Sequence, residues 1–155
     1  MRPVIIGFDG SPASERAVRE VGALLAPHPA VVAVVWEAGR AYEAATTPAL
    51  EAPSVAIELQ SSFDADEGLY AAAQRMAERG AGLAQHAGLS ATAVAVADEK
   101  AVADTLIRLA DEHDAQAIVV GAHGHRGITK LFLGSTSRDV VARASCPVIV
   151  VRDGS

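Results

Sequence analysis

Glycines and hydroxyl side chains late in the chain form the pattern best suited to binding an anion. Gly121, Gly124 and Gly127 follow an apolar run, and Gly134 precedes the three hydroxyl residues Ser135-Thr136-Ser137. Glycine lets the backbone adopt positive φ and lie close to a ligand without a Cβ clash. A helix beginning after Gly134 would add free N–H groups and the positive end of its dipole. The pattern therefore predicts a binding site for phosphate-like groups.

The charge of this segment differs from the charge of the whole chain. The chain has 13 Lys and Arg against 19 Asp and Glu, a formal net charge of −6. The stretch from Gly121 to Arg138 contains Arg126 and Lys130 as well, and it has no acidic residue. A positive segment in an acidic protein favours a local polyanion site. The negative total argues against nucleic acid and anionic membranes as partners, because both are negatively charged.

The spacing differs from two common phosphate-binding motifs. No Gly-Lys-Ser/Thr is present, so the segment is not a Walker P-loop, and the dinucleotide fingerprint belongs directly after the first strand. An alternative interpretation is that the glycines only form a turn and Ser135 only caps a helix. That alternative suits any one of these residues better than it suits the whole set.

Other reactive residues give weaker patterns. Asp9 could bind a ribose, an adenine amine or a metal, or it could be a carboxylate at a helix start. His123 and His125 could place two imidazoles on one side of an extended segment, but zinc would need further ligands, so no metal site is assigned. The favoured role of His123 is to orient a phosphate or brace the loop. No His base is evident for Ser135, and the loop has no carboxylate pair. We therefore expect a binding protein with at most slow hydrolysis.

Alternating strands and helices are expected to position this loop. Short apolar runs predict strands, and apolar residues at helical spacing predict helices between them. The strands are expected at Val4–Phe8, Val31–Trp36, Ala91–Ala97, Ala117–Val120 and Pro147–Val151. The helices are expected to follow caps at Ser11 and Asp98, to run from about Phe63 to His86, and to begin at Ser135. Residues 37–62 are interpreted as a long loop that can hold some helix.

This alternation predicts one α/β domain over residues 1–155, with a parallel sheet covered by helices on both faces. The single cysteine, Cys146, cannot form an internal disulfide. No apolar run approaches the roughly 20 residues that span a bilayer, and Val4 to Ile6 is too short for a signal-peptide core. These features are consistent with a cytoplasmic protein.

The spacing Gly121-x2-Gly124-x9-Gly134-Ser135 resembles the ATP-binding signature of the universal stress protein family. The similarity extends to Asp9-Gly10-Ser11 and to Cys146–Val151, and it covers nearly the whole chain except about residues 37–63. The resemblance implies an open, doubly wound five-stranded sheet in the order 3-2-1-4-5. This fold is Rossmann-like, of the adenine nucleotide alpha hydrolase type. The loops after the first and fourth strands would then face each other across a crevice.

The resemblance also implies which residues hold ATP. The ribose and phosphates would contact Gly121, Ala122, His123, Gly124, His125, Arg126, Gly127, Gly134, Ser135, Thr136 and Ser137. The adenine would be framed by Gly7, Phe8, Asp9, Val35 and Trp36. Trp36 stands where the family often has a smaller aliphatic residue, so its indole could stack on the base or crowd the pocket. Mg²⁺ or Mn²⁺ would accompany the phosphates.

The function implied is nucleotide-dependent regulation in a stress response. The alternatives are a nucleotide-free interaction module, a binder of AMP or cyclic AMP, and a slow ATP hydrolase. The last apolar strand, Pro147 to Arg152, is expected at a sheet edge, where it invites pairing with another chain. A two-fold homodimer through this strand is the simplest closed arrangement, and the resemblance implies dimers.

Overall fold

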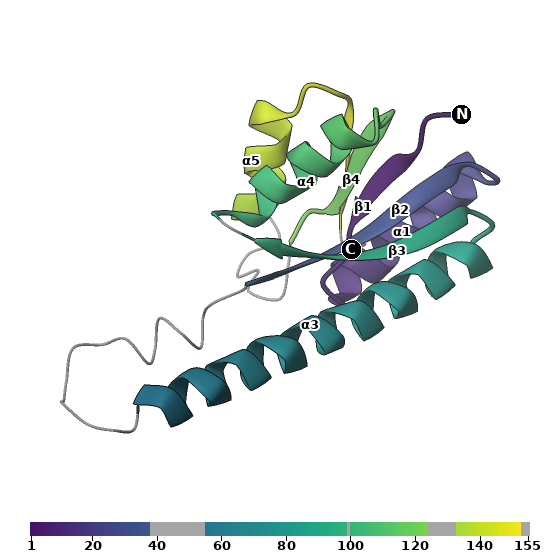
Figure 1. The fold of residues 1–155 in the computed structure, drawn as a ribbon. Coiled ribbons are helices and arrows are strands. Elements are labelled where there is room, and N and C mark those ends of the chain that lie inside the picture. Colours follow the sequence, from purple (N-terminus) through teal and green to yellow (C-terminus); the bar gives the residue numbers. More distant parts are fainter. Residues whose placement is uncertain (38–54, 99, 124–132, 153–155) are drawn as a thin grey trace.

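The computed structural model describes residues 1–37, 55–98, 100–123 and 133–152, with the backbone alone for residues 55–64. Within these ranges, strands and helices alternate along the chain (Figure 1). The strands are β1 (Val4–Gly7), β2 (Pro29–Glu37), β3 (Ser90–Asp98), β4 (Ala117–Gly121) and β5 (Val148–Val151). The helices are α1 (Pro12–Leu25), α3 (Val55–His86), α4 (Val102–Glu112) and α5 (Ser135–Arg143).

The strands form one parallel sheet in the order β3-β2-β1-β4-β5, which confirms the predicted fold. The central strand β1 pairs with β2 on one side and β4 on the other, and Val4 lies opposite both Ala30 and Ala117. Because all strands run the same way, the loops after β1 and β4 leave the same edge of the sheet. This is the switch point at which parallel α/β sheets hold ligands.

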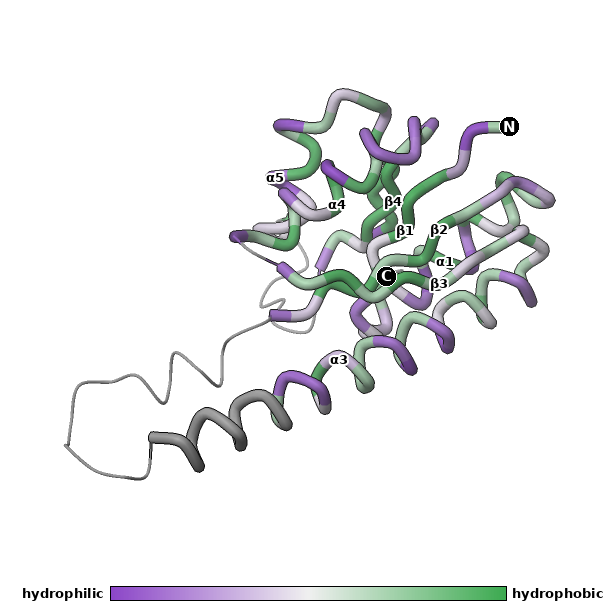
Figure 2. Tube along the Cα trace, in the orientation of Figure 1, coloured by the Kyte–Doolittle hydropathy of each residue, from purple (hydrophilic) through white to green (hydrophobic). Residues whose placement is uncertain are grey.

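Helices cover both faces of the sheet (Figure 1), and the strands are largely apolar along their length (Figure 2), as expected of strands buried on both faces. On one face, Ile6 and Val32 pack with small residues of α1 and α3, such as Ala17 and Ala77. On the other face, Ile5, Ile118 and Val120 pack with residues of α4 and α5, including Leu106 and Val140. The helical side of the first core is rich in alanine, which fits a chain with only 4% aromatic residues.

Helix α1 begins as the sequence predicts. The Ser11 hydroxyl accepts a hydrogen bond from the Ser14 amide at 3.2 Å, and Pro12 occupies the first turn. The predicted end of the next helix at His86 also agrees with the structure, and Gly88, two residues later, has a φ of +93°. The start of α1 and the end of α3 are therefore set by local residue types, which a single sequence shows directly.

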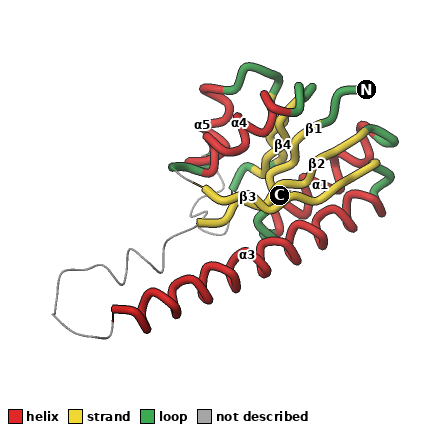
Figure 3. Tube along the Cα trace, in the orientation of Figure 1, coloured by secondary structure: helices red, strands yellow, loops and turns green. Residues whose placement is uncertain are grey.

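Helix α3 is longer than predicted. It begins at Val55 rather than near Phe63, and its first turns extend past the sheet (Figures 1 and 3). Pro53 and weak periodicity suggested a loop, but no glycine or proline interrupts the chain from residue 54 to Gly68. A helix segment that projects beyond the sheet has no core face, so apolar periodicity does not reveal it.

The predicted cap at Asp98 is wrong. Asp98 is the last residue of β3, and its Oδ1 accepts a hydrogen bond from the Lys100 amide at 2.8 Å. Helix α4 starts later, with Ala101 as an N-cap that makes no side-chain bond. The carboxylate therefore turns the chain at the strand end. None of the helices in the described part of the chain has the length and apolar character needed to cross a membrane.

Candidate functional site

A cavity of about 490 Å³ opens at the carboxyl ends of the strands. This volume lies within the range of about 300–1,000 Å³ typical of small-molecule sites. The ends of β1, β2 and β4 and the first turns of α4 and α5 supply its walls. The lining residues are Gly7, Phe8, Asp9, Ser14, Ala33, Val35, Glu37, Val102, Leu106, Val120, Gly121, His123, Gly134, Ser135, Thr136 and Ser137.

One wall of the cavity is apolar. Val35 comes from β2, Leu106 from α4 and Val120 from β4. Gly7 belongs to the same wall, because a Cβ built there would lie 3.1 Å from Leu106 Cδ1 and 3.4 Å from Val120 Cγ1. A side chain at Gly7 would crowd Leu106 and Val120, and a flat apolar group such as a nucleobase could rest against the wall that these three residues form.

The start of α5 supplies the polar wall. Gly134 is the N-cap and has no side chain to bond the first turn. The first bond of the helical ladder runs from the Arg138 amide to the Gly134 carbonyl at 3.0 Å. The amides of residues 135–137 therefore have no acceptor within the helix. Together with the Ser135 and Thr136 hydroxyls, these amides form a donor cluster suited to an anion.

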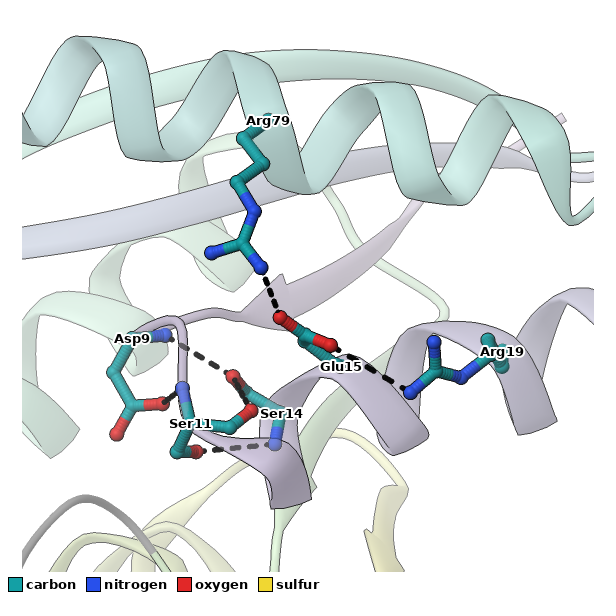
Figure 4. A network of polar contacts seen from close by, with 6 residues as sticks. All are labelled: Asp9, Ser11, Ser14, Glu15, Arg19 and Arg79. Atoms are coloured by element: carbon teal, nitrogen blue, oxygen red, sulfur yellow. Dashed lines mark hydrogen bonds and ion pairs between the residues drawn. The ribbon is translucent and has the colours of Figure 1, made fainter.

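Hydrogen bonds and ion pairs hold the loop after β1 and the first turn of α1 (Figure 4). Asp9 Oδ1 accepts a hydrogen bond from the Ser11 amide at 2.9 Å, and the Asp9 amide reaches Ser14 Oγ at 3.5 Å. Glu15, in the first turn of α1, pairs with Arg79 of α3 and lies 3.6 Å from Arg19. Asp9 therefore stabilises the turn before α1 and also lines the cavity.

The structure brings most of the predicted site residues to one cavity. They are Gly7, Phe8, Asp9, Val35, Gly121, His123, Gly134, Ser135, Thr136 and Ser137. Ala122 is not among the lining residues; it is 1% exposed and braces the loop ends through its backbone. The predicted residues Gly124, His125, Arg126 and Gly127 lie outside the described residues.

Trp36 does not face this cavity, contrary to expectation. Its ring lies 5.9 Å from that of Tyr70 on α3, and it packs with the core between the sheet and α1 and α3. Val35, the preceding residue, packs on the opposite face with the α4 side. Successive side chains of a strand point to opposite faces, so Val35 and Trp36 cannot share one wall. In this structure the indole neither stacks in the cavity nor blocks it.

Sequence reasoning missed several lining residues. Glu37 follows Val35 by two positions on β2, so strand alternation places it at the same cavity. Val102 and Leu106 are four residues apart on α4 and therefore share a helix face. Both spacings were visible in the sequence, but only the sheet order shows that these faces meet the loop after β4. In the described ranges, no group of three or more His, Cys, Asp or Glu side chains could hold a metal ion.

Comparison with known sequences points to one family. The family model described as the universal stress protein family matches residues 1–152. Universal stress protein Rv2005c of Mycobacterium tuberculosis is 33% identical over 151 residues, which covers 97% of this chain and 45% of that protein. A Thermus aquaticus universal stress protein is 44% identical over 50 residues, covering 32% of this chain and 36% of that protein. The matched region therefore covers less than half the length of either relative, and for Rv2005c it includes almost the whole of this chain.

Solved structures agree with this match. The universal stress protein of Archaeoglobus fulgidus superposes with a TM-score of 0.68 at 24% identity, covering 98% of this chain and 94% of that one. A universal stress protein solved in complex with cAMP superposes with a TM-score of 0.59 at 27% identity, covering 97% of this chain and 96% of that one. The shared fold and the match along almost the entire sequence lead to one conclusion: this chain belongs to the universal stress protein family.

Proposed function

We propose that the cavity binds ATP and that nucleotide binding regulates the contacts of this protein with partners in a stress response. The observation that carries the proposal is the pairing of two unlike walls in one cavity. The apolar wall of Gly7, Leu106 and Val120 suits adenine, and the donors at the start of α5 suit phosphates. A nucleotide presents these two chemistries at its two ends.

The family supports an adenine nucleotide. A relative that is 27% identical was solved with cAMP, which shares its base and ribose with ATP. The choice of a triphosphate rests on the number of donors, because three amides and two hydroxyls gather at the start of α5. The sequence adds positive charge to the same segment, with Arg138 on α5 itself. AMP and cAMP remain the alternative ligands for this cavity.

A divalent cation would accompany the phosphates. Mg²⁺ is usually bound through one or two carboxylates and the phosphates of the substrate, and it keeps several waters. Asp9 and Glu37 are carboxylates among the lining residues and could serve this purpose. When bound, the cation would offset the negative charge of the triphosphate. The residues of the chain bind and orient the nucleotide, and slow ATP hydrolysis is the alternative activity.

Isothermal titration tests the proposal directly. Purified protein is titrated with ATP, AMP, cAMP and adenosine, each with Mg²⁺. We expect ATP to bind most tightly, and we expect the double change Ser135→Ala with Thr136→Ala to weaken ATP at least about tenfold, because hydrogen bonds to charged groups contribute roughly 1.5–3 kcal/mol. Adenosine binding should be unchanged by that variant. Folded protein that binds no ATP at millimolar concentration would contradict the proposal.

We also propose a homodimer through the edge strand β5. Ile149 and Val151 pack toward the α1 and α3 side of the sheet, and Val148 and Val150 pack toward the α4 side. All four residues are only partly buried within one chain, and β4 is the neighbour of β5 in the sheet. A second copy would extend the sheet and cover them. The cytoplasmic location and the single domain over residues 1–155 stay predictions.

A further inference from the structure

Ser137 was expected to bind phosphate, but its hydroxyl is used inside the protein. The side chain is 2% exposed. Its Oγ lies 3.0 Å from the Ala122 carbonyl oxygen and 3.0 Å from the Gly134 carbonyl oxygen. A serine hydroxyl carries one proton, and both neighbours are acceptors. The proton that would bond a phosphate is therefore already donated to a backbone carbonyl.

The peptide groups of Ala122 join three parts of the fold. The Ala122 amide donates to the Val151 carbonyl at the end of β5, at 2.8 Å. The Ala122 carbonyl accepts from the Gly134 amide at 2.8 Å, in addition to the Ser137 hydroxyl. Ala122 follows β4 directly and Gly134 precedes α5, so these bonds connect the two ends of the intervening loop. Such buried bonds are costly to break, since the groups left behind have no water to replace them.

We propose that Ser137 is a positioning residue that fixes the start of α5 against the end of β4. This inference rests on the proposed function, because its purpose is to keep the amides of the first turn directed into the nucleotide cavity. Ser135, which is exposed at the cavity, and its neighbour Thr136 then make the phosphate contacts. A site held in its binding geometry before the ligand arrives loses less entropy on binding.

Three variants separate positioning from direct binding. Ser137→Ala removes the hydroxyl that holds the loop ends, Ser137→Thr keeps a hydroxyl, and Ser135→Ala removes a hydroxyl at the cavity surface. For each variant, ATP affinity is measured by calorimetry. Hydrogen exchange of the Gly134 and Ala122 amides is measured by NMR without nucleotide. Thermal unfolding confirms that each variant is folded.

We expect Ser137→Ala to weaken ATP binding by up to about tenfold, because without this hydrogen bond, worth about 1–1.5 kcal/mol, the binding geometry must be re-formed when ATP binds. The same variant should exchange the Gly134 amide faster in the absence of nucleotide, because its acceptor is no longer held in place. Ser137→Thr should restore both properties. Ser135→Ala should weaken ATP binding and leave the exchange rate of the Gly134 amide unchanged.

Two results would overturn the inference. Loss of ATP affinity in Ser137→Ala with unchanged exchange would make Ser137 a direct ligand. Faster exchange with unchanged affinity would reduce its role to fold stability alone. If the extra methyl of Ser137→Thr prevents folding, the comparison of Ser137→Ala with Ser135→Ala decides. Wild-type protein that binds no ATP would instead contradict the proposed function. In that case the exchange measurement still tests the inference, because an unchanged exchange rate of the Gly134 amide in Ser137→Ala would show that Ser137 does not hold the start of α5 against the end of β4.

Discussion

A side chain at position 7 would crowd the apolar wall that we assign to the base. A Cβ there would already lie 3.1 Å from Leu106 Cδ1, and the branches of valine would reach further into the apolar wall. We therefore predict that Gly7→Val weakens ATP binding at least about tenfold and lowers the free energy of unfolding by about 1–3 kcal/mol through overpacking. Calorimetric titration and urea denaturation measure the two effects.

Gly68→Val is the matched control for this change. Gly68 is exposed on α3, and a Cβ there meets nothing within 4 Å. The control should keep ATP affinity and stability close to those of the wild type, because valine has a slightly better helix propensity than glycine. Gly7→Val protein that is folded and binds ATP as the wild type does would show that the base lies elsewhere.

The neighbouring pair Val35 and Trp36 shows what sequence can say about a single residue. The end of the second strand was predicted to frame the adenine, and in the structure Val35 lines the cavity. The sequence did not show which of the two side chains faces the cavity, because an apolar strand buried on both sides gives no polar face to identify. The contact of Trp36 with Tyr70 depends on α3, which covers that face of the sheet.

Close packing between helices gives a prediction at the scale of elements. Gly22 of α1 lies against the end of α3, where a Cβ would meet Ala87 Cβ at 2.3 Å and the Ala87 carbonyl oxygen at 2.7 Å. Alanine is favoured over glycine in a helix by about 1 kcal/mol. The backbone overlap should exceed that gain, so we predict that Gly22→Ala lowers the free energy of unfolding by about 1–3 kcal/mol in urea denaturation.

A glycine-to-alanine substitution within α3 should instead raise the free energy of unfolding. A Cβ at Gly82 meets nothing within 4 Å. Gly82→Ala should therefore raise the free energy of unfolding by up to about 1 kcal/mol, as expected from helix propensity alone. A gain in stability in Gly22→Ala as well would show that α1 and the end of α3 do not approach closely at Gly22.

Element ends were predictable where local chemistry sets them and unpredictable where it does not. The cap at Ser11 follows from one hydroxyl and the proline after it, and the structure confirms it. Asp98 has the same capping chemistry, but β3 continues through that residue in register with Glu37 of β2. Pairing with a neighbouring strand thus outweighs a local capping preference, and a single sequence does not reveal that pairing.

At the scale of the molecule, the sheet order was predicted and explains where the cavity lies. Alternating strands and helices limit the topology, and the family resemblance selected the order that the structure confirms. That order brings the loops after β1 and β4 together, so residues as distant in sequence as Asp9 and Ser135 line one cavity. Contributions from α4, including Leu106, were missed because they depend on how a helix packs across the sheet.

Because β5 lies at the edge of the sheet, a substitution on its open side can affect dimer formation without affecting its pairing with β4. The Ile118 amide donates to the Pro147 carbonyl and the Ala122 amide donates to the Val151 carbonyl. Residues of odd number on β5 therefore direct their backbone groups toward β4, while Val148 and Val150 direct theirs to the open edge. Proline lacks an amide hydrogen, so its effect depends on which of these two sides it occupies.

We therefore predict that Val150→Pro prevents dimer formation and keeps the ladder between β4 and β5 intact. Sedimentation equilibrium should give the wild type a mass of about twice 15.9 kDa and the variant a mass near 15.9 kDa. The variant should still bind ATP, because the Val151 carbonyl continues to hold the Ala122 amide. Ile149→Pro is the control, and it should destabilise the fold because it removes a ladder bond. A wild-type monomer, or a Val150→Pro dimer, would rule out association through this edge.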